Sequence, residues 1–209
     1  MKEKIVIIGG GGHAKVIASI IKKIGEFEII GYTDEEDKGV ILEFPFLGND
    51  NQFLSNNFQN IKCAAIGIGQ IKSSALRKKV VDQYKNAGFH FPIIISPYAI
   101  VNENVGIGEG TVIFDGAVIN TYSSIGSFVI INTNSTVEHD CNIGDFVHLA
   151  SNSVLSGNVI IGNGTFIGAG ATIIQGIEIE HDVIIGAGST ATKNCFAGKT
   201  YIGVPAKLL

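Results

Sequence analysis

The segment VEHDCNIGDFVHLA, residues 137–150, brings ionisable side chains into a tract otherwise rich in Ile, Val, Gly, Ser and Thr. His139 lies between two carboxylates, Glu138 and Asp140. Free imidazole has a pKa of about 6.5, so much of it can accept a proton at physiological pH. A neighbouring carboxylate can hold one ring nitrogen protonated, leave the other as acceptor and stabilise the cation that forms. We therefore predict that His139 is a general base.

A glycine-rich loop near the N-terminus is a second candidate site. Gly9, Gly11 and Ala14 match the G-x-G-x-x-G/A spacing between a predicted strand and helix. Asp34 and Glu35 follow at the end of the next predicted strand. Bare backbone and a helix N-terminus suit a phosphate group. A nucleotide sugar, an NAD cofactor and a purely structural turn all fit this spacing, and we favour the nucleotide sugar.

The second half of the chain has a strict repeat that must position the histidine segment. From Ile95 to Ile185, one aliphatic residue recurs at every sixth position without a gap. A second register, from Ala99 to Ser189, holds small or β-branched residues four places later. A period of six is the signature of a parallel β-helix, in which three flat sides make a coil of about 18 residues. We expect this fold over residues 94–191.

The two registers predict which side chains of the segment are available for chemistry. Val137 fills the interior and Cys141 occupies the small slot, so Cys141 is expected to pack and not to act as a nucleophile. His139, Asp140 and His148 fall outside both registers and are expected to point outward. The histidines and cysteines lack the spacing of a zinc site, and we expect no metal.

Residues 1–93 have the pattern of a small α/β domain. Alternating strands and helices favour a Rossmann-like parallel sheet with helices packed on it. We expect strands over residues 4–8, 28–34 and 62–67 and helices over residues 13–24 and from Ser73–Ser74 to near Gly88. The last segment, residues 192–209, leaves the six-residue frame and is expected to cap the open end of the coil.

Composition narrows the class of protein further. The chain has 209 residues, a net charge of -4 and no basic cluster, which argues against a nucleic-acid partner. It has no apolar run of about 18 residues for a membrane span, and its N-terminus lacks the pattern of a signal peptide. Its three cysteines are odd in number and far apart, so no disulfide framework is indicated. We predict a soluble, cytoplasmic protein with no membrane partner.

Three motifs carry a resemblance to a known family. GGGGHAKV at the front, NTNSTVEHDCNIG in the middle and YIGVPAKLL at the end resemble the bacterial hexapeptide-repeat sugar O-/N-acetyltransferases. This family includes sialic acid O-acetyltransferases and nucleotide-4-aminosugar N-acetyltransferases, and the resemblance spans essentially the whole chain. It implies a left-handed β-helix, acetyl-CoA as co-substrate and a homotrimer with active sites between subunits.

The resemblance also implies roles for individual residues. It matches Asp140 to the acidic residue that makes the catalytic histidine a stronger base, and Asn132 to a position near the acceptor. Small residues after His139, Gly157 among them, offer backbone groups that would suit the amide-rich pantetheine arm of CoA. The remaining matches are CoA contacts at His148, Ala169 and Ala187, substrate contacts at Gly11, Gly12 and His13, and carboxylates beside the nucleobase at Asp34 and Glu35.

These observations favour one function over three others. We predict an acetyl-CoA-dependent N-acetyltransferase that acts by direct attack on the 4-amino group of a UDP-linked amino-deoxysugar in glycan biosynthesis. O-acetylation of sialic acid or a related sugar is the nearest alternative, and the glycine loop favours a nucleotide on the acceptor. An inert β-helix scaffold and an NAD-linked enzyme are the alternatives from other classes.

Overall fold

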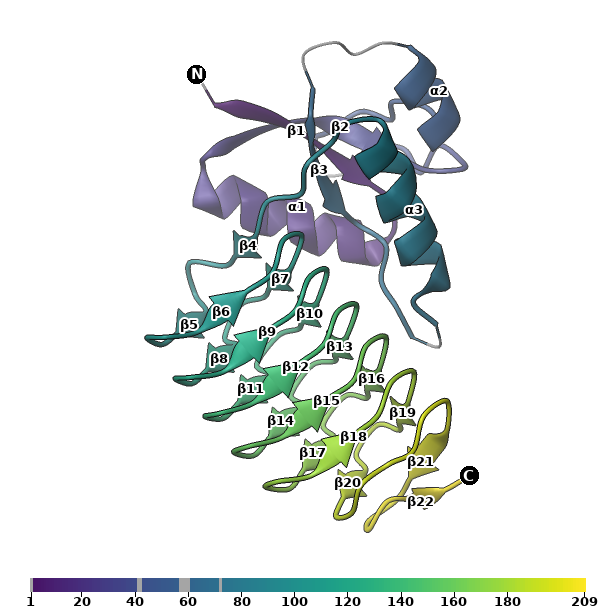
Figure 1. Ribbon diagram of the computed structural model, residues 1–209. Coiled ribbons are helices and arrows are strands. Elements are labelled where there is room, and N and C mark those ends of the chain that lie inside the picture. The colour runs from purple at the N-terminus through teal and green to yellow at the C-terminus, as the bar shows by residue number, and fades with distance from the viewer. Residues whose placement is uncertain (1, 41–42, 57–60, 72) are drawn as a thin grey trace. The chain divides into compact units, whose positions relative to one another are not determined.

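The computed structural model describes residues 2–40, 43–56, 61–71 and 73–209 (Figure 1). The chain forms two compact units. The first comprises Met1–Gly69 and Ala75–Pro97, and the second comprises Gln70–Ser74 and Tyr98–Leu209. Among the described residues, no helix is both long and apolar enough to cross a membrane.

The first unit is built on a small parallel sheet with helices, as the alternating pattern predicts. Its three strands lie in the order β2-β1-β3, and the central strand runs parallel to both neighbours. The strands are β1 (Glu3–Ile8), β2 (Phe27–Thr33) and β3 (Cys63–Ile66), followed later by the short β4 (Ile94–Ile95). The helices are α1 (Gly12–Ile24), α2 (Asp50–Ser55) and α3 (Ala75–Asn86).

Local sequence explains most of these elements. The apolar run at the end of β1 is fully buried, as expected for the central strand of a covered parallel sheet. Helix α1 ends at Gly25, whose φ of 75° is readily adopted only by a residue without a Cβ. The sequence analysis missed α2, because six residues are too few to show helical periodicity; a capping box between Asn49 and Gln52 starts it. Helix α1 buries Ile17, Ile20 and Ile21, whereas Val16 of the same helix is 42% exposed.

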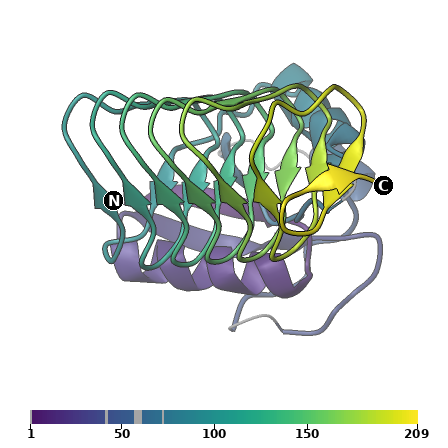
Figure 2. The same cartoon turned by 90° about the horizontal axis from the view of Figure 1, so that it is seen from below.

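The second unit is a parallel β-helix with three sides, whose coils Figure 2 shows stacked in order from teal to yellow. Strands pair at an offset of one 18-residue coil: Ile130 lies between Val112 and His148. Side A contains β7 (Val112–Ile113), β10 (Ile130–Ile131), β13 (His148–Leu149), β16 (Phe166–Ile167), β19 (Ile184–Ile185), β21 (Thr200–Ile202) and β22 (Lys207–Leu208). Side B contains β5 (Ile100–Val101), β8 (Val118–Ile119), β11 (Thr136–Val137), β14 (Val154–Leu155), β17 (Thr172–Ile173) and β20 (Thr190–Ala191). Side C contains β6 (Gly106–Ile107), β9 (Ser124–Ile125), β12 (Asn142–Ile143), β15 (Ile160–Ile161) and β18 (Glu178–Ile179).

Both predicted registers lie where the repeat requires them. The aliphatic register is buried from Ile113 through Ile185 and forms the core of the coil. The small register is buried from Thr111 to Ser189 except at Ile177, and four of its polar members make one recurring hydrogen bond. Thr111, Ser123, Ser135 and Thr165 each donate a hydroxyl hydrogen to the carbonyl oxygen fifteen residues further along the chain. These four buried hydroxyls are tolerated in the slot because each has an acceptor.

A third register, absent from the sequence analysis, forms the bends between sides. Every sixth residue from Asn104 to Gly188 has a φ between 55° and 73°. Most are Gly, Asn or Asp, the residue types that tolerate this left-handed conformation best. Tyr122, Phe128 and Phe146 also adopt it, and the last two stack with ring centroids 5.1 Å apart. Asp140 belongs to this register with a φ of 60°, so its backbone is constrained although its side chain points outward.

The C-terminal segment covers the last coil. Strand β21 continues side A in parallel, and β22 pairs with it antiparallel at the end of the sheet. A Cβ at Gly186 would lie 2.7 Å from Cγ2 of Ile202, so the glycine allows the tail to approach closely. The tail pairs with strand groups of the last coil that would otherwise form an open edge.

Candidate active site

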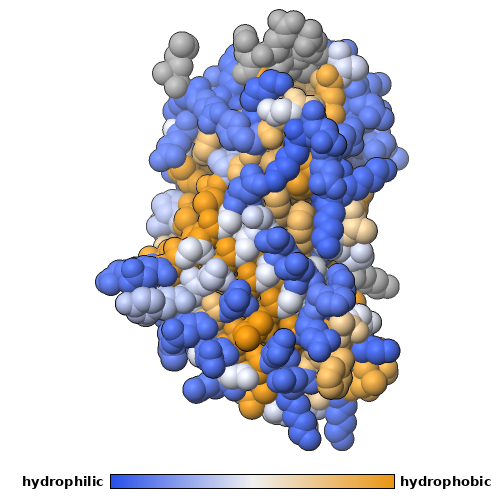
Figure 3. All heavy atoms as spheres, viewed as in Figure 1, coloured by the Kyte–Doolittle hydropathy of each residue, from blue (hydrophilic) through white to orange (hydrophobic). Residues whose placement is uncertain are grey.

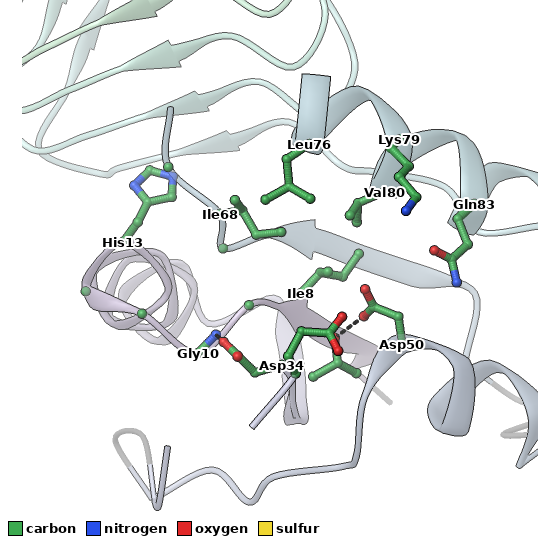
Figure 4. A pocket seen from close by; sticks show the side chains of 17 residues that line it. Ile8, Gly10, His13, Asp34, Asp50, Ile68, Leu76, Lys79, Val80 and Gln83 are labelled. Atoms are coloured by element: carbon green, nitrogen blue, oxygen red, sulfur yellow. Dashed lines mark hydrogen bonds between the residues drawn. The ribbon is translucent and has the colours of Figure 1, made fainter. Parts of the chain in front are cut away.

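The first unit contains a cavity of about 420 Å³ at the carboxyl ends of its parallel strands (Figure 4). Sites at this edge are typical of open parallel sheets. The glycine loop and His13 lie at one end of the cavity, and Asp50 and Gln83 lie at the other. Apolar side chains line the space between them: Ile8, Ile68, Leu76 and Val80. The cavity thus combines a backbone-lined end, an apolar middle and a polar end.

The glycines of the loop serve different purposes. A Cβ at Gly10 would lie 2.6 Å from the Tyr32 ring, so packing alone requires a glycine there. A Cβ at Gly11 or Gly12 would meet no atom within 4 Å, so these two residues present bare backbone to open space. Gly11 is also the N-cap of α1 and caps it with no side-chain hydrogen bond. The first-turn N–H groups and the positive end of the helix are thereby suited to an anion.

Both predicted acidic residues, Asp34 and Glu35, line this cavity, and Asp34 forms a hydrogen bond with the glycine loop. Asp34 Oδ2 accepts a hydrogen bond from the Gly10 backbone N–H at 2.7 Å. Glu35 lines the cavity as an exposed side chain. The structure therefore brings Gly11, Gly12, His13, Asp34 and Glu35 together around one space, as a single binding site would require.

The sequence analysis missed the polar end of the cavity. Asp50 Oδ1 accepts hydrogen bonds from the Thr33 hydroxyl at 2.7 Å and the Tyr84 hydroxyl at 2.8 Å. Burial and the nearby Asp50 charge raise the pKa of Tyr84, so this phenol remains a donor. Lys79 and Gln83 line the same region from α3. No motif marks these residues, because they come from α2 and α3, whose order around the sheet is set by the tertiary fold.

In the second unit, the predicted base and acid form a hydrogen-bonded pair on the bend between sides B and C. His139 Nδ1 lies 2.7 Å from Asp140 Oδ2. An ionised carboxylate can only accept, so Nδ1 carries the hydrogen and Nε2 keeps its lone pair. The histidine and aspartate side chains are 54% and 58% exposed. The left-handed turn at Asp140 places the two side chains together.

Gly157 lies directly beside the imidazole. It occupies the same bend one coil later, and a Cβ there would lie 2.7 Å from both Cε1 and Nε2 of His139. Any side chain at this position would displace the ring or cover the nitrogen that bears the lone pair. Gly157 is predicted in the CoA groove from the sequence, and in the structure it lies against the predicted base.

Glu138, the second carboxylate beside His139, binds elsewhere. Its Oε2 accepts from Asn120 Nδ2 at 2.8 Å, and Asn120 Oδ1 accepts from Asn102 Nδ2 at 2.7 Å. These residues recur at the offset of one coil along the edge between sides B and C. The structure therefore assigns the orienting contact to Asp140, a choice that the residue order alone left open.

A second histidine–aspartate pair, not considered in the sequence analysis, lies on another bend. His181 and Asp182 repeat the EHD string, and the His181 Nδ1 to Asp182 Oδ2 distance is 3.0 Å. Asp182 has the same left-handed turn, with a φ of 55°. This pair lies between sides C and A, and no glycine whose surroundings the structure describes meets its ring as Gly157 meets His139. The His181–Asp182 pair can therefore serve as a control for the His139–Asp140 pair.

His148 lies outside the core registers, as predicted, but it is buried and not exposed to solvent. Only 8% of its surface is exposed, and Gln70, which belongs to the same compact unit as the β-helix, lies against it. Its Nδ1 donates to the Gln70 carbonyl oxygen at 2.6 Å, and its Nε2 lies 3.3 Å from Asn132 Nδ2. Gln70 Nε2 donates in turn to the Phe146 and Gly164 carbonyls. The six-residue repeat predicts that this side chain lies outside the core, but it cannot reveal that Gln70, which is distant in the sequence, contacts it.

The residues matched to CoA contacts lie on a different edge from the predicted base. Ala169 and Ala187 are exposed on the edge between sides A and B, on successive coils. Asn132 begins a bend of the same edge, and His148 belongs to side A. His139 lies on the edge between sides B and C. Within one chain, the β-helix therefore separates these residues by a full side.

Cys141 is held in the small slot by the contact that serine and threonine make elsewhere. It is buried, and its Sγ donates to the Ser156 carbonyl oxygen, fifteen residues on, at 3.3 Å. Burial raises the pKa of the thiol, so it stays protonated at neutral pH. This geometry agrees with the prediction that Cys141 packs.

We expect Cys141→Ser to retain acetyl transfer within about twofold, because a hydroxyl in this slot finds the same acceptor. The check is a comparison of kcat/KM and of the unfolding midpoint with the unsubstituted protein. A loss of activity above tenfold without a loss of stability would assign the thiol a chemical role.

Comparisons with known proteins agree with this architecture. Residues 4–84 match the PglD N-terminal domain family, and residues 158–193 match the bacterial transferase hexapeptide family in six repeats. No curated protein sequence matches significantly. The fold and the repeat define a hexapeptide-repeat acyltransferase with a left-handed β-helix.

Solved structures extend the comparison over the whole chain. A perosamine N-acetyltransferase variant from Caulobacter crescentus, solved with CoA and GDP-perosamine, is 35% identical with a TM-score of 0.93, over 99% of this chain and 96% of that one. The acetyltransferase domain of PglB from Neisseria gonorrhoeae with acetyl coenzyme A is 32% identical with a TM-score of 0.92, over 100% of both chains. WeeI from Acinetobacter baumannii is 27% identical with a TM-score of 0.89, also over 100% of both. The chain belongs to the family of bacterial hexapeptide-repeat sugar acetyltransferases.

Proposed function

We propose that this protein transfers the acetyl group of acetyl-CoA to the 4-amino group of a GDP-linked amino-deoxysugar, with His139 as the general base. The observation that carries the proposal is the exposed His139–Asp140 pair, whose Nε2 lies over a glycine. Two structures of the Caulobacter protein, solved with CoA and GDP-perosamine, carry a replacement of one histidine by asparagine or alanine. That choice of variants fits a histidine at the centre of the reaction.

The proposed reaction is a direct attack. The sugar nitrogen attacks the thioester carbonyl carbon of acetyl-CoA while His139 Nε2 takes one of its protons. Asp140 holds Nδ1–H and stabilises the imidazolium that forms. The tetrahedral intermediate then collapses, the carbon–sulfur bond breaks, and the CoA thiolate takes the proton from the imidazolium. The products are the N-acetyl sugar nucleotide and free CoA.

The cavity of the first unit is the proposed nucleotide site. Gly11, Gly12 and the start of α1 would receive the diphosphate, and the base would lie between the apolar side chains of the middle. Asp50, already held by two hydroxyl donors, would accept from the edge of the base. Guanine offers an N–H and an NH₂ group on that edge, whereas uracil offers one N–H between two carbonyls. GDP, the nucleotide in the Caulobacter complex, replaces the UDP predicted from the sequence.

The direct test is a thiol-release assay with acetyl-CoA and a panel of acceptors. We expect turnover with a GDP-linked 4-amino sugar, and kcat/KM at least about tenfold lower with the UDP- and dTDP-linked analogues, a difference of about 1.4 kcal/mol. Free sialic acid serves as the O-acetylation arm. Turnover with sialic acid alone would contradict the proposal, and an absence of turnover with every acceptor would contradict the transferase function itself.

We further propose that the working form is a homotrimer in which each site combines two chains. His139 and the matched CoA-contact residues lie on different edges of one β-helix, so a second copy has to bring its A–B edge to the B–C edge of the first. Figure 3 shows apolar and weakly polar residues in a band along the visible β-helix surface, between hydrophilic residues. Contiguous exposed apolar surface of this kind is typical of an interface.

A complementation experiment tests this arrangement. His139→Ala removes the base from the B–C edge. Ala169→Trp places a bulky side chain among the residues matched to CoA contacts on the A–B edge. Each variant alone should be nearly inactive. In trimers refolded from an equal mixture, a site is intact only where an Ala169→Trp chain supplies the B–C edge and a His139→Ala chain supplies the A–B edge. This holds for about one interface in four, so the mixture should regain about a quarter of full activity. Sedimentation should give about three times the chain mass of 22.1 kDa. An active monomer, or a mixture without recovery, would contradict the shared site.

A further inference from the structure

Three side chains with different metal-binding atoms converge at the amino ends of strands β1 and β3, at the sheet edge opposite the nucleotide cavity. They are Glu3, Cys63 and His90, and their oxygen, sulfur and nitrogen atoms all lie within 4.8 Å of one another. Glu3 Oε1 and His90 Nε2 are 3.0 Å apart. The sequence does not reveal this cluster, because the residues are far apart and follow no metal-binding spacing.

Backbone pairing fixes the three residues relative to one another. Cys63 pairs with Ile5 of β1 on one side and forms an isolated parallel bridge with His90 on the other. His90 N–H donates to the Lys62 carbonyl at 2.7 Å, and its own carbonyl accepts from Ala64 N–H at 3.1 Å. Residues in register on neighbouring strands point to the same face of the sheet, so Ile5, Cys63 and His90 share one face. Glu3 precedes Ile5 by two residues in the same strand and therefore points to this face as well. The cluster is therefore part of the sheet and does not belong to a mobile loop.

The set of donor atoms suits one class of ion. Imidazole nitrogen, thiolate sulfur and carboxylate oxygen are the ligands of zinc, with bonds of about 2.0–2.3 Å. Around a tetrahedral ion, such atoms lie roughly 3.3–3.6 Å apart, which small rotations of the present side chains can reach. Soft sulfur together with imidazole disfavours magnesium and calcium.

Cys63 is fully buried, and the cluster opens to solvent on the side of the other two residues. Glu3 and His90 are half-exposed, with 51% and 54% of their side chains accessible, which provides a path from solvent. The neighbouring cation is directed away: Lys62 Nζ donates to the Ala87 carbonyl at 3.0 Å and lies over the Phe89 ring. Burial and the Glu3 charge raise the pKa of the Cys63 thiol to about 12, so a bound metal has to displace that proton.

We propose that Glu3, Cys63 and His90 bind one zinc-class divalent ion, with water as the fourth ligand, and that this ion ties together β1, β3 and the segment after α3. The site lies apart from the nucleotide cavity and takes no part in acetyl transfer. Its role is to stabilise the first unit, because an ion that binds only the folded chain raises its stability.

Cobalt is the probe for this site, because a thiolate ligand gives Co²⁺ a strong charge-transfer absorption. The full-length protein, stripped with a chelator and kept reduced, is titrated with Co²⁺ and then with Zn²⁺. We expect one Co²⁺ per chain, a sulfur-to-cobalt band that Cys63→Ser removes and Cys141→Ser retains, and displacement by Zn²⁺. Zn²⁺ should also raise the unfolding midpoint of the unsubstituted protein.

Two exposed variants keep the test decisive if Cys63→Ser does not fold. Glu3→Gln and His90→Gln should retain the far-ultraviolet circular dichroism spectrum and bind Co²⁺ about 10- to 100-fold more weakly. A titration without a charge-transfer band, or a band that persists in Cys63→Ser, would overturn the proposal. The readout is metal binding and not acetyl transfer, so either result leaves the proposed enzymatic function unaffected.

Discussion

His139→Ala should lower kcat/KM for acetyl transfer by about 10²–10⁴-fold, the usual contribution of a positioned general base. This corresponds to about 3–5 kcal/mol of transition-state stabilisation. The side chain is 54% exposed and lies outside the buried core registers, so the variant should fold. Steady-state kinetics measure the loss, and calorimetry of CoA and sugar-nucleotide binding should show affinities within about threefold of the unsubstituted protein.

The matched control is His181→Ala. His181 has the same turn, the same aspartate contact and a 66% exposed side chain, but its ring does not lie over a glycine. If the His139 ring acts as the base, the His181 variant should keep full activity. Equal losses in both variants would point to a structural role of histidine–aspartate turns in the coil. Full activity of the His139→Ala variant would eliminate His139 as the base.

Gly157→Ala should lower kcat by about 10²-fold, because misplacement of a catalytic group by about 1 Å has an effect of this size. The new methyl group would lie 2.7 Å from Nε2 of His139, so the ring has to turn away from its position or lose access to the substrate. The glycine does not have a positive φ, and its backbone therefore accepts alanine. Steady-state kinetics at saturating acetyl-CoA provide the measurement.

The split between kcat and KM distinguishes two roles of this glycine. Contact with the pantetheine arm, as the sequence analysis expects, would raise KM for acetyl-CoA with kcat nearly unchanged. Positioning of the base would lower kcat instead. Gly106→Ala is the control, because a Cβ there would meet no atom within 4 Å and the residue also lies in the β-helix. An effect of equal size at Gly106 would show that any added methyl group disturbs the coil.

Much of the fold is determined by local chemistry that can be seen in the sequence. The aliphatic and small residues repeat every six positions because each side of the coil buries one large residue and admits one small residue. The same repeat places Cys141 in the core and directs His139 outward. The alternating runs of the first half likewise predict β1, α1, β2, β3 and α3. The handedness of the coil came from the family resemblance, since a period of six residues is the same for either hand.

The sequence by itself thus determined the repeat and the class of fold and singled out His139 as the candidate base, because these depend on residues within one or two turns of each other. Only the tertiary structure decided which atoms meet across coils and strands. It brought Gly157 against His139, placed Gln70 against His148, and directed Glu138 to Asn120. These contacts join residues one coil or more apart, and nothing in their local sequence encodes the distance between them. The physical reason is that the approaches of Gly157 to His139 and of Glu138 to Asn120 follow from backbone pairing at an 18-residue offset, and the contact of Gln70 with His148 follows from a chain segment 78 residues away; neighbouring residues set none of them.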